Sequence, residues 1–177
     1  MRLWKNLAQL LSRPVADSAT TDLYRACVAQ ARRVEFYQTL GIPDTIDGRF
    51  DLLVLHVFLV MRRLAEQRDV KQKLFDLMFT DMDRCLREMG VGDMSIGKKI
   101  KPMIQAFYGR ITFYERALNE PDERLAESLQ RNLYGASPAT PENVQRMADY
   151  VRQALAALDR QDLSDIITGH VVFVTPV

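Results

Sequence analysis

The amino-acid sequence predicts an all-α fold, an irregular single-domain helical bundle of five to six main helices. Apolar residues recur every three or four positions through most of the chain, which places them on one face of an α-helix. Glycine, proline and short polar stretches separate these segments. The length of 177 residues, with 47% hydrophobic and 27% charged residues, is typical of one globular domain and excludes a disordered or fibrous chain.

The first thirteen residues predict a short amphipathic helix, with Leu3, Trp4 and Leu7 on one side and Lys5 among the cations of the other. Such a helix can lie in a membrane interface, so these four residues are candidate membrane contacts. The alternative is that Trp4 and its leucines dock on the body of the protein. We therefore divide the chain into residues 1–20, an amphipathic segment with a linker, and residues 21–177, a single helical domain.

The next segment predicts a helix that is capped by Thr20 or Thr21 and ends near Leu40. Its apolar face includes Cys27, and Cys85 lies on a similar face of a later segment. We expect both to be buried, reduced thiols, because no CxxC pair is present.

Residues 49–67 predict the central helix, because residues 52–61 are apolar nearly all the way round. This run has about half the length that a membrane-spanning helix requires, so we expect no transmembrane segment. His56 lies within the run. We expect a core histidine bonded to a backbone carbonyl, and the alternative is a haem or metal ligand.

Residues 76–114 predict two helices joined by a glycine-rich turn. Gly90 and Gly92 end the first helix, and Asp93 or Ser95 caps the second. We expect Pro102 to mark the first turn of the second helix or to kink it near its start. Phe107 continues the apolar face of that helix and is expected in the core.

The same segment contains a local cluster of cations in a chain whose net charge is only +1. Such a cluster is a candidate site for a partner or a polyanion, either ribosomal RNA or an anionic membrane surface. The alternative is a solvated helix start. The candidate residues are Lys98, Lys99, Lys101, Arg110 and the neighbouring Tyr108.

The C-terminal third predicts two further helices and a tail. Pro121 and two acidic residues open the first, which Gly135 ends. Thr140 and Pro141 open the second, as a cap and a first-turn proline. Residues 170–175 are β-branched and are expected to be extended along a helix.

No catalytic or metal-binding pattern is present, so we expect no enzyme activity and no cofactor. The serines lie outside nucleophile motifs, and Gly97–Lys99 lacks the spacing of a phosphate-binding loop. Asp81 and Asp83 point about 200° apart on a helical wheel and cannot share a metal without further ligands.

Several blocks in a fixed order resemble the ubiquinol–cytochrome c chaperone family. The likeness is clear from about Thr21 to Leu118 and looser beyond. The blocks are Asp47–Phe50, Leu52–Leu64, Leu74–Asp76, Asp81–Asp83, Leu86–Asp93, Gly97–Lys101 and Phe107–Arg110.

The resemblance implies a non-enzymatic chaperone that binds newly made cytochrome b and supports its maturation into ubiquinol–cytochrome c reductase (respiratory complex III). It implies no catalytic residues, and its partners would include a ribosome or a small partner protein but no DNA. Residues 1–21 contain few arginines and include Asp17, so they do not resemble a mitochondrial presequence. We expect a bacterial member at the cytoplasmic face of the inner membrane. The alternative function is a peripheral membrane- or ribosome-associated scaffold with a different client.

Overall fold

The computed structural model describes residues 17–120, 122–135, 137 and 139–176, and within them no residue forms a β-strand. The all-α prediction is therefore confirmed. The predicted N-terminal helix, with Leu3, Trp4, Lys5 and Leu7, lies outside the described residues. The helices are α2 Ser18–Ala31, α3 Val34–Gln38, α4 Ile46–Arg63, α5 Arg68–Glu88, α6 Asp93–Leu118, α7 Asp122–Leu129, the π-helical turn η1 Gln130–Tyr134, α8 Pro141–Arg160 and α9 Leu163–Ile167.

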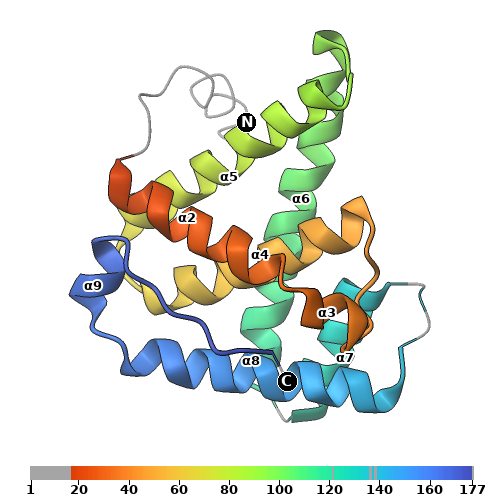
Figure 1. Ribbon diagram of the computed structural model, residues 1–177, viewed down its shortest axis with the longest axis vertical. Helices are drawn as coiled ribbons and strands as arrows, with labels where there is room; N and C mark the ends of the chain where they lie inside the picture. Colours follow the sequence, from red (N-terminus) through yellow and green to blue (C-terminus); the bar gives the residue numbers. More distant parts are fainter. Residues whose placement is uncertain (1–16, 121, 136, 138, 177) are drawn as a thin grey trace.

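Helix α4 is the centre of the fold, as its all-round apolar sequence predicts. Every side chain from Phe50 to Val60 is buried, and the helix packs against α2, α6, α8 and η1 (Figure 1). It begins at Ile46 rather than at residue 49, because the Thr45 side chain accepts a hydrogen bond from the backbone N–H of Gly48 (3.1 Å). Among the described helices, none is both long enough and apolar enough to span a membrane.

Helices α5 and α6 form an antiparallel hairpin whose far end extends beyond the rest of the molecule (Figure 1). Gly90 ends α5 with a φ of +82°, as predicted. The prediction for α6 was wrong in two respects. Its N-cap is Gly92, without a side-chain cap, and Pro102 lies well inside the helix. Pro102 and Lys98 are both exposed, so water can bond the carbonyl that the proline leaves without a donor.

The predicted single helix from residue 20 to 40 is two helices. The N-cap is Asp17, whose carboxylate accepts a hydrogen bond from the backbone N–H of Thr20 (2.8 Å). Helix α2 then ends at Ala31, and the extended backbone of Arg33 (φ −62°, ψ 131°) separates it from α3. This turn places the Phe36 ring edge-on against the rings of His56 (5.3 Å) and Tyr150 (4.9 Å).

A buried hydrogen-bond network joins α2, α4, α8 and the C-terminal tail. His56 Nδ1 donates to the carbonyl of Leu52 (2.8 Å), and its Nε2 accepts from the hydroxyl of Tyr150 (2.7 Å). Gln30 donates to the same hydroxyl oxygen (2.9 Å) and to the carbonyl of Val174 (2.7 Å). Burial lowers the pKa of His56 to about 4, so the imidazole is neutral at pH 7. The prediction of a carbonyl-bonded core histidine is confirmed.

The C-terminal third follows the predicted helix boundaries. Thr140 caps α8 by accepting a hydrogen bond from the backbone N–H of Asn143 (3.1 Å), and Gly135 ends the preceding turn with a φ of +57°. The tail is extended, as predicted, and Gln161 holds it through the backbone N–H and carbonyl of Val172 (both 2.8 Å). The η1 turn and α9 were not predicted.

Candidate functional site

An open apolar groove of ≈190 Å³ lies where the α5–α6 hairpin joins the body of the protein. Five helices contribute to it, from α2 through α6. The groove is lined by Tyr24, Val28, Ala31, Arg32, Tyr37, Ile46, Arg49, Phe50, Leu53, Asp81, Met82, Cys85 and Met103.

The apolar wall of the groove combines flexible and exposed side chains. Met82 from α5 and Met103 from α6 are half-buried, and Ile46 at the start of α4 is 64% exposed. An isoleucine this exposed gains little from folding, because most of its surface still faces water. The methionine thioethers can adapt to an irregular apolar ligand. This wall is therefore suited to an apolar partner surface.

The polar groups in the wall are bonded to one another. The Tyr24 hydroxyl donates to the Asp81 carboxylate (2.7 Å), and burial together with that carboxylate raises the pKa of Tyr24. A tyrosine–carboxylate pair that is already formed presents no free donor to a ligand. The groove therefore offers apolar contact rather than a polar recognition site.

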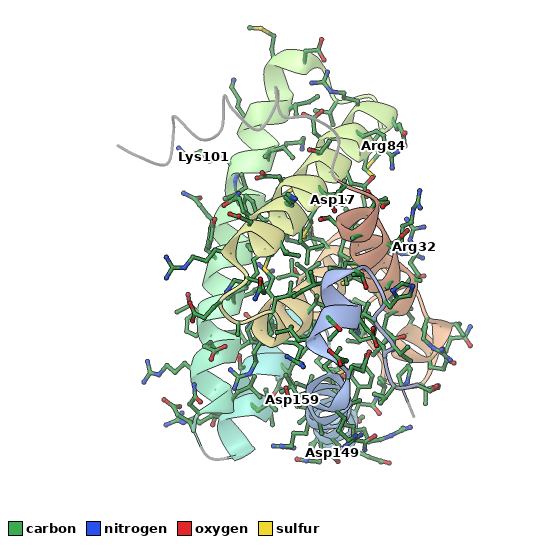
Figure 2. The ribbon with its side chains drawn as sticks, turned by 90° about the vertical axis from the view of Figure 1, so that its left-hand side faces the viewer. Asp17, Arg32, Arg84, Lys101, Asp149 and Asp159 are labelled. Carbon is green, nitrogen blue, oxygen red and sulfur yellow. The ribbon has the colours of Figure 1, made fainter. Side chains whose placement is uncertain are left out.

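The rim of the groove is cationic. Arg49 pairs with Asp44 at its Nε (2.5 Å) and Nη2 (3.1 Å) and lies 5.5 Å from the centre of the Tyr37 ring. Arg32 is exposed at the end of α2, and Figure 2 shows it projecting outward. Within the described residues, no carboxylate lies within 4.0 Å of Arg32.

Cys85 lies in the groove and is half-buried, whereas Cys27 is fully buried. The prediction of a buried thiol therefore holds for Cys27 and only in part for Cys85. Burial raises the pKa of both thiols, so both are protonated at neutral pH.

Arg110 does not join the predicted cationic cluster. Its guanidinium contacts the buried carboxylate of Asp51 (2.6 Å) and lies 5.9 Å from the centre of the Phe50 ring. Burial raises the pKa of Asp51 to about 6, although the charge of Arg110 acts in the opposite direction. Arg110 is thus one half of an ion pair between α4 and α6, and we remove it from the candidate polyanion-binding residues.

The three lysines of the cluster lie together on the first turns of α6, and all three are exposed. Figure 2 shows Lys101 on α6 and Arg84 on α5 at opposite edges of the hairpin. Tyr108 lies about two turns beyond Lys101 on the same face. Its ring packs on Phe75 (5.5 Å between centres) and is 47% exposed. Phe107 is 1% exposed, so its predicted place in the core is confirmed.

His56 is in no position to act as a haem or metal ligand. Both nitrogens of His56 are bonded and the residue is fully buried, so it cannot bind haem or a metal without breaking the network. The described part of the chain contains no group of three His, Cys, Asp or Glu side chains that could hold a metal ion.

A protein family and individual relatives match most of this chain. Residues 38–173 match the protein family described as ubiquinol-cytochrome C chaperone. The chain is 26% identical to ubiquinol-cytochrome-c reductase complex assembly factor 1 of Xenopus laevis, over 88% of this chain and 80% of that protein. It is 28% identical to the mitochondrial protein CBP3 of Saccharomyces cerevisiae, over 92% of this chain but 53% of the yeast protein.

A solved structure is similar along nearly its whole length. The crystal structure of the Cbp3 homolog from Brucella abortus superposes with a TM-score of 0.79 at 28% sequence identity. The similarity covers 98% of this chain and 96% of the bacterial chain.

Proposed function

This chain belongs to the ubiquinol-cytochrome C chaperone family, and we propose that it is a non-enzymatic chaperone for assembly of the ubiquinol–cytochrome c reductase complex. Its relatives in frog and yeast include a protein named as an assembly factor of that complex. The Brucella abortus structure shows that the fold occurs in bacteria. We place the protein at the cytoplasmic face of a bacterial inner membrane, where the membrane subunits of such a complex are made.

The client that we propose is cytochrome b, and the groove is its binding surface. The observation that supports this choice is an open apolar groove with the exposed Ile46 and two half-buried methionines. A newly made membrane protein exposes apolar segments that would otherwise aggregate, and such a segment gains free energy by leaving water. The cationic rim, with Arg32 and Arg49, can contact polar or anionic residues that flank the apolar segment.

Substitution of Ile46 by Glu tests the groove without disturbing the fold. Ile46 is the first residue of α4, and a carboxylate is favourable at a helix N-terminus. Cytochrome b binding should weaken at least about tenfold, since an apolar contact is lost and a carboxylate would face the apolar client. Val172→Glu is the matched control, because Val172 is 71% exposed and lies in the tail.

The measurement is recovery of cytochrome b with the tagged protein from its own cells. Reduced recovery with Ile46→Glu, and unchanged recovery with Val172→Glu, is the expected result. Equal recovery with both variants would show that the client binds elsewhere.

The second candidate function is a peripheral scaffold for a different client, which the same apolar groove would also suit. Deletion of the gene separates the two functions. Loss of cytochrome b alone, measured by its haem absorbance and by quantitative proteomics, is expected for the chaperone. A decrease of several unrelated membrane proteins would instead favour the scaffold.

A further inference from the structure

The tip of the α5–α6 hairpin, residues Met89–Met94, exposes two large apolar side chains. Met89 is 57% exposed and Met94 is 92% exposed, and both lie at the end that projects farthest from the body (Figure 1). Neither packs on the core, so neither is explained by the stability of the fold. The hairpin contributes Asp81, Met82, Cys85 and Met103 to the groove, so neither methionine of the tip lines it.

The acidic groups near the tip are held by arginines. Arg87 bonds Asp83 (2.7 Å) and Asp93. Arg84 bonds Asp81 and lies 3.8 Å from Glu88. These pairs reduce the repulsion that the carboxylates would exert on an anionic surface.

Two of the lysines behind the tip, Lys98 and Lys99, have no such compensation. Lys98 and Lys99 are exposed, and among the described residues no carboxylate oxygen lies within 4.0 Å of either ammonium group. Lys98 and Lys101 follow Met94 by one and two helical turns on the same face of α6. The hairpin therefore presents exposed apolar side chains at its tip and exposed cations one helical turn behind them.

We propose that this tip docks on an anionic lipid bilayer, with Met89 and Met94 in the interface and the lysines at the phosphate level. The rise from Met94 to Lys98 is about 6 Å, and the headgroup layer of one leaflet is about 5–8 Å thick. The spacing therefore matches the layer that the two kinds of side chain would occupy. RNA would use the lysines equally well, but it gives no reason for two exposed methionines at the outermost point.

This contact goes beyond the proposed chaperone function and does not depend on which client the groove holds. It would bring the groove close to the membrane in which an apolar client is inserted. The test uses the purified full chain and vesicles without any client, so its failure would leave the chaperone function unaffected.

The first experiment measures co-sedimentation with phosphatidylcholine vesicles that contain or lack phosphatidylglycerol. A lysine near an anionic surface contributes about 1 kcal/mol, or about fivefold in affinity. The Lys98→Glu/Lys99→Glu double variant should therefore bind at least about 30-fold more weakly. The Arg25→Glu/Arg68→Glu variant is the control, because it has the same net charge as the lysine double variant. It should bind as the wild type does, since both arginines are exposed on the body and not at the tip.

The second experiment distinguishes insertion into a bilayer from binding to RNA and from attraction by charge alone. Met89→Ser/Met94→Ser should weaken vesicle binding and leave any binding to ribosomes unchanged. In a Cys85→Ser background, an environment-sensitive dye on Met94→Cys should shift to shorter wavelength with anionic vesicles, and the same dye on Val172→Cys should not.

Three results would overturn the proposal. One is absence of wild-type binding to anionic vesicles at low salt. Another is vesicle binding that the lysine or methionine variants leave unchanged, as would happen if another part of the chain bound lipid. The third is an unchanged dye spectrum at position 94. Thermal melting of each variant checks that the fold is intact.

Discussion

Protonation of His56 should destabilise the protein at acidic pH. The pKa of this imidazole is lowered to about 4 in the folded chain and returns to the ordinary value of 6.5 on unfolding. The unfolded chain therefore binds the proton more tightly than the folded chain does. Stability is complete above pH 6.5, falls as the pH decreases through that value, and stops changing below about pH 4.

The magnitude follows from the two pKa values. Between pH 7 and pH 5 the free energy of unfolding should fall by about 2 kcal/mol through His56 alone, and by pH 4 the loss should reach about 3 kcal/mol. Asp51 has the opposite effect, because burial raises its folded pKa to about 6 and its protonation favours the folded state. The wild-type curve contains both effects, so only a comparison of variants isolates His56.

Urea unfolding of the wild type, His56→Gln and His170→Gln between pH 7 and pH 4.5 measures this difference. His56→Gln is less stable at every pH because the network is broken, but its stability should fall less as the pH decreases. His170→Gln is the control, since His170 is the other of the two histidines and is exposed. It should show the wild-type dependence on pH.

Nuclear magnetic resonance gives a second readout that does not depend on the stability of a variant. In the His170→Gln protein the remaining histidine signal should titrate near pH 4. A titration near pH 6.5, or the same pH dependence of stability in His56→Gln and wild type, would refute a buried neutral imidazole.

Two further predictions concern the packing around α4. Arg110→Met should lower the free energy of unfolding by about 3 kcal/mol, because it leaves the buried Asp51 carboxylate unpaired. In an Asp51→Asn background the same change should cost much less. An equal cost in both backgrounds, measured by urea unfolding, would contradict the ion pair. Gly48→Ala should destabilise by at least about 2 kcal/mol, because a Cβ there would lie 2.1 Å from the carbonyl oxygen of Pro43. Gly109→Ala is its control, since a Cβ meets nothing within 4 Å and should stabilise α6 by about 0.5–1 kcal/mol.

The helices that local sequence determines were predicted well. Helix α8 has a capping threonine, a first-turn proline and a regular apolar face, so all the information lies within its own residues. Helix α4 was predicted to be central because its apolar run is too continuous for a surface helix. The break at Arg32–Arg33 could not be predicted, because neither residue disfavours a helix and the turn depends on packing of Phe36 between distant rings.

The candidate site was less predictable, because charge and apolar surface depend on partners elsewhere in the chain. Arg110 was assigned to the lysine cluster from its position in the sequence, and only the fold shows Asp51 of α4 beside it. The groove was missed because five helices contribute to it and no single segment contains its pattern. The exposure of Met89 and Met94 could have been predicted, because both lie beside the glycine turn. At the end of a hairpin, few other elements are close enough to cover an apolar side chain.

Site-specific cross-linking tests the central claim most directly, namely that the groove holds cytochrome b. A photo-reactive amino acid would replace Met103 in the groove or Val172 in the tail, and each variant would be irradiated in its own cells. We predict a cross-link to cytochrome b from position 103 and none from position 172. No cytochrome b cross-link from position 103, with cross-links to other membrane proteins instead, would contradict the proposed function.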